Sequence, residues 1–497
     1  MIGKGRLKRE HVLPLAVGAG TLLAMLAPAS FGAFMERAAG LFLRHFDLWT
    51  IVLPTACFIL CVAVAVLPQG REVIGGRYAK PQFRTVTWIA MMFAAGMGSG
   101  LVFWGAAEPL IHLNVPPPGD GVEPGSVAAR RQGLAITQFH WGLHAWAIYA
   151  VSAMAIGLSF SRGGLILPSA PFVGLSRKWR RVIDWAALVA VMFGIVASLG
   201  QGVFQVSAGL RVISNGAFPS SIGTQMLFLI LMTAGYLASA WLGLRRGIAI
   251  LSNINMAIAA LLAAYILIAG PTGTILQTLW ESTAAYLGSF AELSVSLRPE
   301  GAPRDWTRAW SLTYFLWWVA WTPFVGVFLA RISRGRSLRS FVAAAVIVPT
   351  AASILWFSIL GGAAIAQQQA GIDLGVSDFA TAPQATYVML EGLPLTTLWQ
   401  AVTMVLIVIF IITSADSGAY VLAMFSERDA DPSPGMRMYW GGVLAALTAA
   451  ALLARAGQDT TRALAVAGSI PLTLLLAGQG AAMAWRLFRP SKDDRVN

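Results

Sequence analysis

Side chains that could bind a ligand are concentrated in one short apolar stretch, "QFHWGLHAWAIYA" at residues 138–150. His140 and His144 have the four-residue spacing at which two imidazoles on one helix can bind a metal ion. Glu108 and Asp416 are the only acidic residues within or at the edge of a long apolar segment. An integral membrane metalloenzyme using Glu108 and both histidines is therefore one hypothesis. No acidic or cysteine ligand lies near these histidines in the sequence, which favours histidines hydrogen-bonded between helices.

Aromatic rings offer a second kind of chemistry. Trp141, Trp146 and Tyr149 fall on one broad face of a continuous helix, and "YFLWWVAW" places Trp317 and Trp318 deep inside another apolar segment. Rings around one opening attract a delocalised cation such as a trimethylammonium group, at roughly 0.5–2 kcal/mol per ring. Because this group forms no strong hydrogen bond, we expect the rings to hold it without a buried carboxylate as counter-charge.

The composition indicates which elements position these residues. The 497 residues are 57% hydrophobic and 11% charged, with a mean hydropathy of +0.69, whereas soluble proteins carry about 25% charged residues. Apolar blocks of about 20 residues are long enough to cross a bilayer. Cys57 and Cys61 share one such block and are expected to be core residues. We predict an all-α polytopic membrane protein with twelve transmembrane helices, at about 12–34, 47–68, 85–108, 132–158, 182–210, 222–244, 248–268, 309–330, 340–365, 397–424, 438–455 and 463–486.

The net charge of +13 follows the membrane topology. With a cytoplasmic N-terminus, segments on the inner side carry 25 of the 35 Lys and Arg residues, as the positive-inside rule requires. Both termini are therefore predicted to be cytoplasmic, and no nucleic-acid partner is needed. The alternative is that Lys4 to Arg9 and the following apolar run form a cleavable signal peptide, which would leave eleven spans.

Two spans carry residues that interrupt helices. "AAGMGSG" has glycines at 96, 98 and 100, and "WTPFVG" contains Pro323. Glycine frees the backbone to unwind and proline removes a helical hydrogen bond. Two interrupted helices, five spans apart, are typical of transporters built from inverted repeats, whose binding site lies at mid-membrane. Close packing of helices by small residues explains the glycines alone equally well.

Four stretches resemble the betaine/carnitine/choline transporter (BCCT) family, in the family's order and over nearly the whole chain. They are "GMGSGLVFWGAAEPL", "HWGLHAWAIYA", "SLTYFLWWVAWTPFVGVFLARISRGRS" and "TSADSGA". The resemblance implies a LeuT-like fold of two inverted five-helix repeats preceded by two extra helices, usually as a homotrimer. The expected divisions are 1–84 (N-terminus and leading helices), 85–268 (first repeat), 269–308 (extracellular amphipathic connector), 309–486 (second repeat) and 487–497 (cytoplasmic tail).

The resemblance also implies roles for particular residues. The substrate-binding set would be Trp141, Trp146, Tyr149 and Trp318 with the glycine segment Gly96, Met97, Gly98, Ser99 and Gly100. A second aromatic cluster on the cytoplasmic pathway would be Trp317, Trp321 and Phe328. The sodium site would be Ala94, Met97, Phe410, Thr413 and Ser414. Such oxygen ligands suit a hard cation.

Several positions bear on the coupling ion. Sodium-independent exchangers of the family place an arginine from span seven in the sodium site, but residues 248–268 contain no Lys or Arg. Proton-coupled choline members tend to carry Asp at the end of the glycine motif, where this chain has Gly100. Val191 and Ile195 stand where a second sodium site would use threonines, so one sodium ion is expected.

These features together predict a membrane transporter rather than an enzyme. It would import a small quaternary ammonium zwitterion such as glycine betaine by sodium symport and alternating access, for osmoprotection, across the bacterial cytoplasmic (inner) membrane. No cofactor is expected besides the coupling sodium. The alternatives are a sodium-independent exchanger and a proton-coupled choline transporter, and carnitine, ectoine or a sulfonium compound could replace betaine as substrate.

Overall fold

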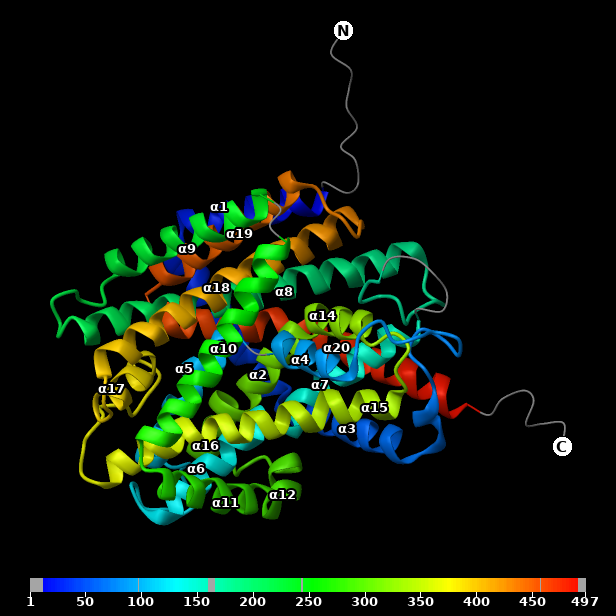
Figure 1. The fold of residues 1–497 in the computed structure, drawn as a ribbon. Coiled ribbons are helices and arrows are strands. Elements are labelled where there is room, and N and C mark those ends of the chain that lie inside the picture. The colour runs from blue at the N-terminus through cyan, green and yellow to red at the C-terminus, as the bar shows by residue number, and fades with distance from the viewer. Residues whose placement is uncertain (1–11, 97, 160–165, 243–244, 456, 490–497) are drawn as a thin grey trace, which may run out of the picture.

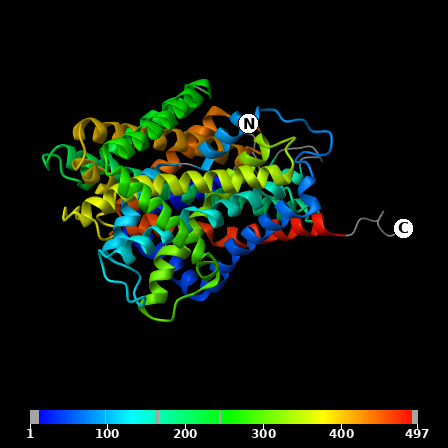
Figure 2. The ribbon, with the colours of Figure 1, turned by 60° about the horizontal axis from the view of Figure 1, so that its bottom comes forward.

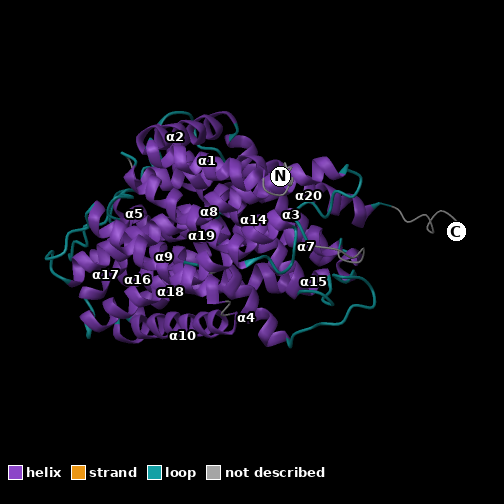
Figure 3. Cartoon of the chain, turned by 90° about the horizontal axis from the view of Figure 1, so that it is seen from above, coloured by secondary structure: helices purple, strands orange, loops and turns teal. Residues whose placement is uncertain are grey.

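The protein is a bundle of helices in a computed structural model that describes residues 12–96, 98–159, 166–242, 245–455 and 457–489. Within these ranges there is no β-strand, and the only β-bridge is an isolated one between Val73 and Ser337. Seen from above, the chain is helix and connecting loop throughout (Figure 3). The predicted all-α membrane fold is confirmed.

The helices of the first half are α1 Val12–Leu26, α2 Pro28–His45, α3 Asp47–Val66, η1 Pro68–Arg71, α4 Thr85–Gly96, α5 Ser99–Asn114, α6 Val127–Trp141, α7 Leu143–Leu158, α8 Arg177–Ile213, α9 Ile222–Leu242 and α10 Arg245–Ala269. Those of the second half are α11 Thr272–Gly288, α12 Phe290–Val295, α13 Ala302–Thr307, η3 Arg308–Leu312, α14 Thr313–Ile332, α15 Leu338–Val342, η4 Ala343–Ile347, α16 Val348–Gln369, η5 Ala382–Gln384, α17 Ala385–Glu391, α18 Thr396–Glu427, α19 Pro434–Leu453 and α20 Gly457–Phe488. The segments η3 and η4 are π-helical turns that lead into α14 and α16.

Among the described residues, ten helical segments are long and apolar enough to cross a membrane, or eleven if a bent pair counts as one. The predicted number of twelve is therefore not confirmed. The predicted first span, 12–34, is wrong, because it is not one straight helix. Helix α1 ends at Leu26, and α2 continues at 112° to it. Pro28 explains the new start, because proline fits the first turn of a helix but cannot continue one.

The third predicted span is interrupted, as its glycines indicate. Helix α4 ends at Gly96, and α5 begins at Ser99 after Gly98, whose backbone is extended (φ −125°, ψ −173°). The two helices have 12 and 16 residues, each short of the roughly 20 that cross a bilayer. The interruption therefore places a non-helical backbone segment inside the bundle.

The interruption expected at Pro323 is wrong, because α14 runs unbroken from Thr313 to Ile332. Helix α14 packs against α7, α8 and α20, and contact on several sides outweighs one missing hydrogen bond. The break on this side of the bundle lies instead at Gly142 (φ −102°, ψ −138°), between α6 and α7. A side-chain carbon at Gly142 would lie 2.3 Å from the Gln138 carbonyl oxygen and 2.9 Å from the Tyr286 hydroxyl, so only glycine fits.

The centre of the bundle is built from α7, α8, α14, α18 and α20. Helix α8 packs against α18 and α20, and α14 packs against α7 and α20. Figure 1 shows α1, α9 and α19 side by side along one edge, and α11 and α12 along the opposite edge. Figure 2 shows the bundle after rotation, with the end of α20 at one end of it. Helices α11 and α12 occupy the segment expected to be the connector, and α11 packs against α6 and α16. The division into two repeats remains a prediction.

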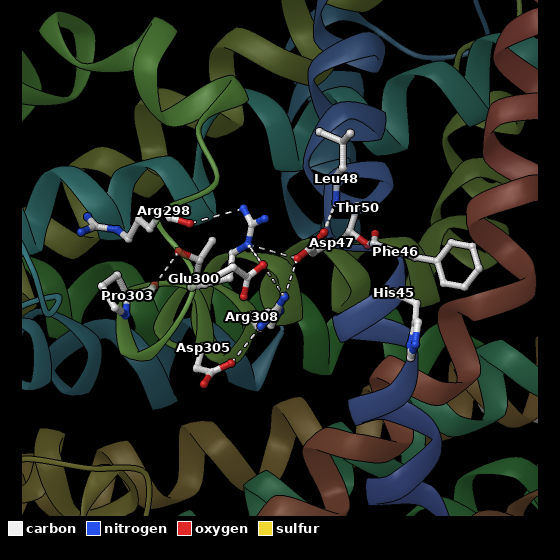
Figure 4. Close-up of polar contacts among 12 residues, drawn as sticks. His45, Phe46, Asp47, Leu48, Thr50, Arg298, Glu300, Pro303, Asp305 and Arg308 are labelled. Carbon is white, nitrogen blue, oxygen red and sulfur yellow. Dashed lines mark hydrogen bonds and ion pairs between the residues drawn. The ribbon is translucent and has the colours of Figure 1, made fainter.

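A group of charged residues joins the start of α3 to the chain before α14, on the side predicted to be extracellular (Figure 4). Asp47 accepts a hydrogen bond from Arg308 at 2.8 Å and lies 3.3 Å from the Arg304 guanidinium. Arg304 also donates to Glu300 and Arg308 to Asp305, each at 3.0 Å. We call these five residues the outer ion-pair cluster.

Candidate functional site

Four aromatic rings meet between α6, α7 and α14, and we call them the aromatic cage: Trp141, Trp146, Tyr149 and Trp318. The Trp318 ring centroid lies 5.5 Å from that of Trp141, 5.4 Å from that of Trp146 and 5.1 Å from that of Tyr149. Trp146 and Tyr149 are 6.1 Å apart. The interplanar angles with Trp318 are 79°, 61° and 56°, so Trp141 and Trp146 meet Trp318 edge to face and the Tyr149 ring is tilted against it. All four are buried.

Hydrogen bonds fix the three indoles by their edges. The N–H of Trp318 donates to the His140 carbonyl oxygen at 3.1 Å, and that of Trp146 to the Trp141 carbonyl oxygen at 3.2 Å. The N–H of Trp141 donates to Glu108 Oε2 at 2.9 Å. Because an indole has only this one donor, the ring faces are left for contacts with other rings or with a ligand.

The glycine segment touches the cage at the start of α5. A side-chain carbon at Gly100 would lie 3.3 Å from Cη2 of the Trp141 ring. Gly98 and Ser99 precede it at the N-terminus of α5, where backbone N–H groups have no partner within the helix. Met97 lies outside the described residues, and of Gly96 only its place at the end of α4 is described.

Four of the five residues expected to bind sodium lie on two helices. Phe410, Thr413 and Ser414 belong to α18, which packs against α5. The Thr413 hydroxyl donates to the carbonyl oxygens of Ile409 at 2.8 Å and Phe410 at 3.2 Å. Its oxygen lone pairs remain able to accept a cation. Ala94 lies in α4, and its side chain and that of Met97 are outside the described part of the chain.

The two positions that speak against a second sodium site are apolar and tightly packed. Val191 and Ile195 are buried in α8. A side-chain carbon at Gly418 of α18 would lie 2.4 Å from Cδ1 of Ile195. Hydrocarbon therefore fills the contact between α8 and α18 at this point.

Trp317, Trp321 and Phe328 lie along one half-buried face of α14. Trp321 is in edge-to-face contact with Phe324, with ring centroids 5.7 Å apart. In the described chain no ring contact joins Trp317, Trp321 and Phe328 to one another, unlike the rings of the cage. They form a row along the helix rather than an enclosure.

Glu108, His112 and His140 come together behind the cage. His140 Nδ1 lies 2.6 Å from Glu108 Oε1, and His112 Nε2 lies 3.6 Å from the same oxygen. Candidate ligand atoms of all three lie within 4.8 Å of one another. Two ligands of a tetrahedral zinc ion are about 3.3 Å apart, given bonds near 2.0 Å. The 2.6 Å separation is instead that of a hydrogen bond, so the arrangement favours a polar network over a metal centre.

The two histidines singled out by their spacing have different surroundings. His140 is hydrogen-bonded between helices, as predicted, since its Nε2 also contacts Ser311 Oγ at 2.8 Å. For His144 the same prediction is wrong, because neither ring nitrogen has a hydrogen-bond partner among the described residues. Its ring packs against Phe139 and Phe290, each with ring centroids 5.0 Å away. His112, which the sequence did not single out, takes its place beside Glu108.

A cavity of about 930 Å³ lies away from the cage. It is lined by side chains of α8, α9, η5 and the junction of α19 with α20, among them Phe204, Arg211, Gln225 and Asp459. No residue predicted to bind substrate or sodium lines it. Its location gives no reason to move the candidate site from the buried rings.

Comparison with known proteins places the chain in one family. Residues 12–495 match the model of the BCCT, betaine/carnitine/choline family transporters. The chain is 36% identical over 471 residues to the glycine betaine transporter OpuD of Bacillus subtilis, covering 92% of this chain and 90% of the relative. It is 35% identical over 443 residues to a glycine betaine/proline/choline transporter of Vibrio parahaemolyticus, covering 84% and 78%. An ectoine/hydroxyectoine transporter of Virgibacillus pantothenticus is 33% identical over 472 residues, covering 94% and 93%.

The helical bundle and these matches define a multi-pass membrane transporter and not an enzyme. The chain belongs to the betaine/carnitine/choline transporter family. The metalloenzyme hypothesis is therefore set aside.

Proposed function

We propose that this protein imports a small quaternary ammonium zwitterion, with glycine betaine as the first candidate, by sodium symport through alternating access. The observation that carries the proposal is the aromatic cage, in which four buried rings meet while the indole N–H groups are bonded elsewhere. Ring faces freed in this way suit a trimethylammonium group, which attracts them electrostatically and needs no hydrogen bond. The relatives named as transporters of glycine betaine support the same class of substrate.

The other end of the zwitterion has a partner in the glycine segment. Helix α5 starts beside Trp141, and its first N–H groups carry the positive end of the helix dipole. A carboxylate bound there would lie next to the cage, so one small molecule would satisfy both features. This arrangement favours glycine betaine over choline, which has no carboxylate.

Sodium coupling is supported by the oxygen atoms of α18. The Thr413 hydroxyl and the Phe410 carbonyl lie on the helix that packs against α5, and span seven contains no basic residue at 248–268 to replace the ion. Inward movement of one charge across 100 mV releases about 2.3 kcal/mol, enough to drive accumulation. We further propose a homotrimer in the bacterial cytoplasmic membrane, with both termini on the cytoplasmic side.

Uptake into proteoliposomes tests this function. With an inward sodium gradient, we expect uptake of labelled glycine betaine, and replacement of sodium by potassium should abolish accumulation. Thr413→Ala removes one proposed ligand and should raise the sodium concentration for half-maximal uptake about tenfold. Thr413→Ser keeps a hydroxyl and is the matched control. Undiminished accumulation in potassium would indicate exchange or proton coupling, which a trans-substrate gradient and a pH gradient distinguish.

A further inference from the structure

A buried acid lies directly behind one wall of the cage. The Glu108 carboxylate, which is fully buried in α5, accepts the indole N–H of Trp141 at Oε2 and contacts His140 Nδ1 at Oε1. His140 is in turn held by Ser311 and stacks on Tyr314, with ring centroids 4.7 Å apart. The acid is therefore fixed in position on the outer edge of a ring whose face belongs to the cage.

In the hydrogen bond between Trp141 and Glu108, the indole N–H is the donor and Glu108 Oε2 is the acceptor. An indole N–H can only donate, so this oxygen is an acceptor. A bond from a neutral donor to a carboxylate is charge-assisted and polarises the donor group. Electron density is pushed from the N–H into the indole, which makes the face of Trp141 more negative and more attractive to a cation.

We propose that Glu108 is the remote counter-charge of the cage, acting through the Trp141 indole and making the site prefer a cationic head group over an uncharged group of the same shape. This inference rests on the proposed function, because it concerns the ligand of the same site. It replaces the expectation that the rings need no carboxylate. The acid does not touch the ligand and is a specificity-determining residue that acts through Trp141, while His140 and Ser311 are positioning residues that hold it.

A carboxylate behind the Trp141 ring, instead of inside the cage, affects which cations the cage can select. A carboxylate lining the cage itself would bind ammonium ions that donate hydrogen bonds, and would repel the carboxylate end of a zwitterion. Behind the ring it contributes attraction for positive charge, since electrostatic interactions act over several ångströms in a buried environment. It offers no hydrogen-bond acceptor inside the cage. The cage can then distinguish a trimethylammonium group both from a primary ammonium and from a tert-butyl group.

A pair of ligands with one shape and different charge tests the proposal. Glycine betaine and 3,3-dimethylbutanoate differ only in that carbon replaces the quaternary nitrogen. We would measure the dissociation constants of both for the purified full-length protein and for Glu108→Gln, which keeps the size and hydrogen-bonding capacity of the side chain. The preference for betaine should fall about tenfold in Glu108→Gln, with dimethylbutanoate binding unchanged or slightly improved.

Two further variants separate charge from structure. Glu108→Asp keeps the negative charge and should retain most of the preference. Glu281→Gln removes an acid of α11 that pairs with Arg130 and Arg131 instead of with a ring of the cage, and it should leave the preference unchanged. Equal weakening of both ligands in Glu108→Gln, or no change in either, overturns the inference while leaving the proposed function standing. Wild-type protein that binds no onium compound overturns both.

Discussion

The aromatic cage and the outer ion-pair cluster differ in what their polar contacts leave available for a ligand. In the cluster, Arg304 and Arg308 are paired with Asp47, Glu300 and Asp305. Each charged group therefore already has an oppositely charged partner within the protein. In the cage, the hydrogen bonds end on the edges of the rings, and the ring faces keep their electrostatic attraction. The ion pairs of the cluster join segments that are far apart in the chain, whereas the hydrogen bonds of the cage hold the tryptophan rings in a fixed orientation.

This difference predicts a division between binding and stability. Changes in the cage should alter the affinity for an onium ligand, and changes in the cluster should alter the thermal stability without altering affinity. Three experiments test this division, in order of decreasing effect.

The largest effect is expected from Trp318→Ala, because the Trp318 ring contacts the three other rings of the cage. Loss of one desolvated ring, worth up to about 2 kcal/mol, should weaken glycine betaine binding about 30-fold. Trp318→Phe keeps a ring, loses the hydrogen bond to the His140 carbonyl, and should weaken binding only a few-fold. Equilibrium binding to folded protein in detergent measures both. Unchanged affinity in folded Trp318→Ala would remove this ring from the site.

A smaller effect, on stability instead of binding, is expected from Asp47→Asn. It removes the more buried of the two acids that Arg304 and Arg308 share, since the Asp47 side chain is 11% exposed and that of Glu300 is 67% exposed. A lost charge-assisted hydrogen bond costs about 1.5–3 kcal/mol, which should lower the melting temperature by several degrees. Asp305→Asn is the matched control, since that side chain is 67% exposed and should cost less than about 1 kcal/mol. A changed affinity at an unchanged melting temperature would contradict the division.

The smallest effect concerns acid stability at α11. The hydrogen bond from Arg131 lowers the pKa of Glu281 to about 2. An acid with a lowered pKa in the folded state stabilises the protein above its ordinary pKa near 4.5, and this contribution is lost as the pH falls toward 2. Because Arg131 is half exposed, the contribution should stay under about 1 kcal/mol.

Melting temperatures of wild type and Glu281→Gln between pH 7 and pH 3 test this contribution. Glu281→Gln should melt lower at pH 7, and the two curves should converge as the pH falls. Parallel curves over this range would show that the ion pair to α6 contributes nothing to the acid dependence of stability.

The helical fold could be predicted because hydropathy alone reports burial in a membrane. The interruption near Gly98 followed from the glycines, which free the backbone locally. Trp141, Trp146 and Tyr149 could be grouped with Trp318 only through the family resemblance, since periodicity relates residues within one helix. The structure brings these four rings together, and their role in binding stays a proposal.

The features that escaped prediction depend on contacts between helices. Glu108 and His140 are 32 residues apart and lie on different helices, so the sequence could name both as candidate metal ligands but could not predict that they are hydrogen-bonded to each other. The unbroken helix at Pro323 depends on its neighbours α7 and α20. The break at Gly142 depends on the approach of Tyr286 from α11. In each case tertiary packing overrides or supplements the local preference of the chain.

The break at Gly142 divides the rings of the cage between two helices that can move relative to each other. Trp141 is the last residue of α6, while Trp146 and Tyr149 belong to α7. A small rotation about the Gly142 backbone would swing one wall against the other two while both helices stayed intact. The relative orientation of these indoles thus depends on the torsion angles of a single residue, and a side-chain carbon there would collide with the Gln138 carbonyl oxygen.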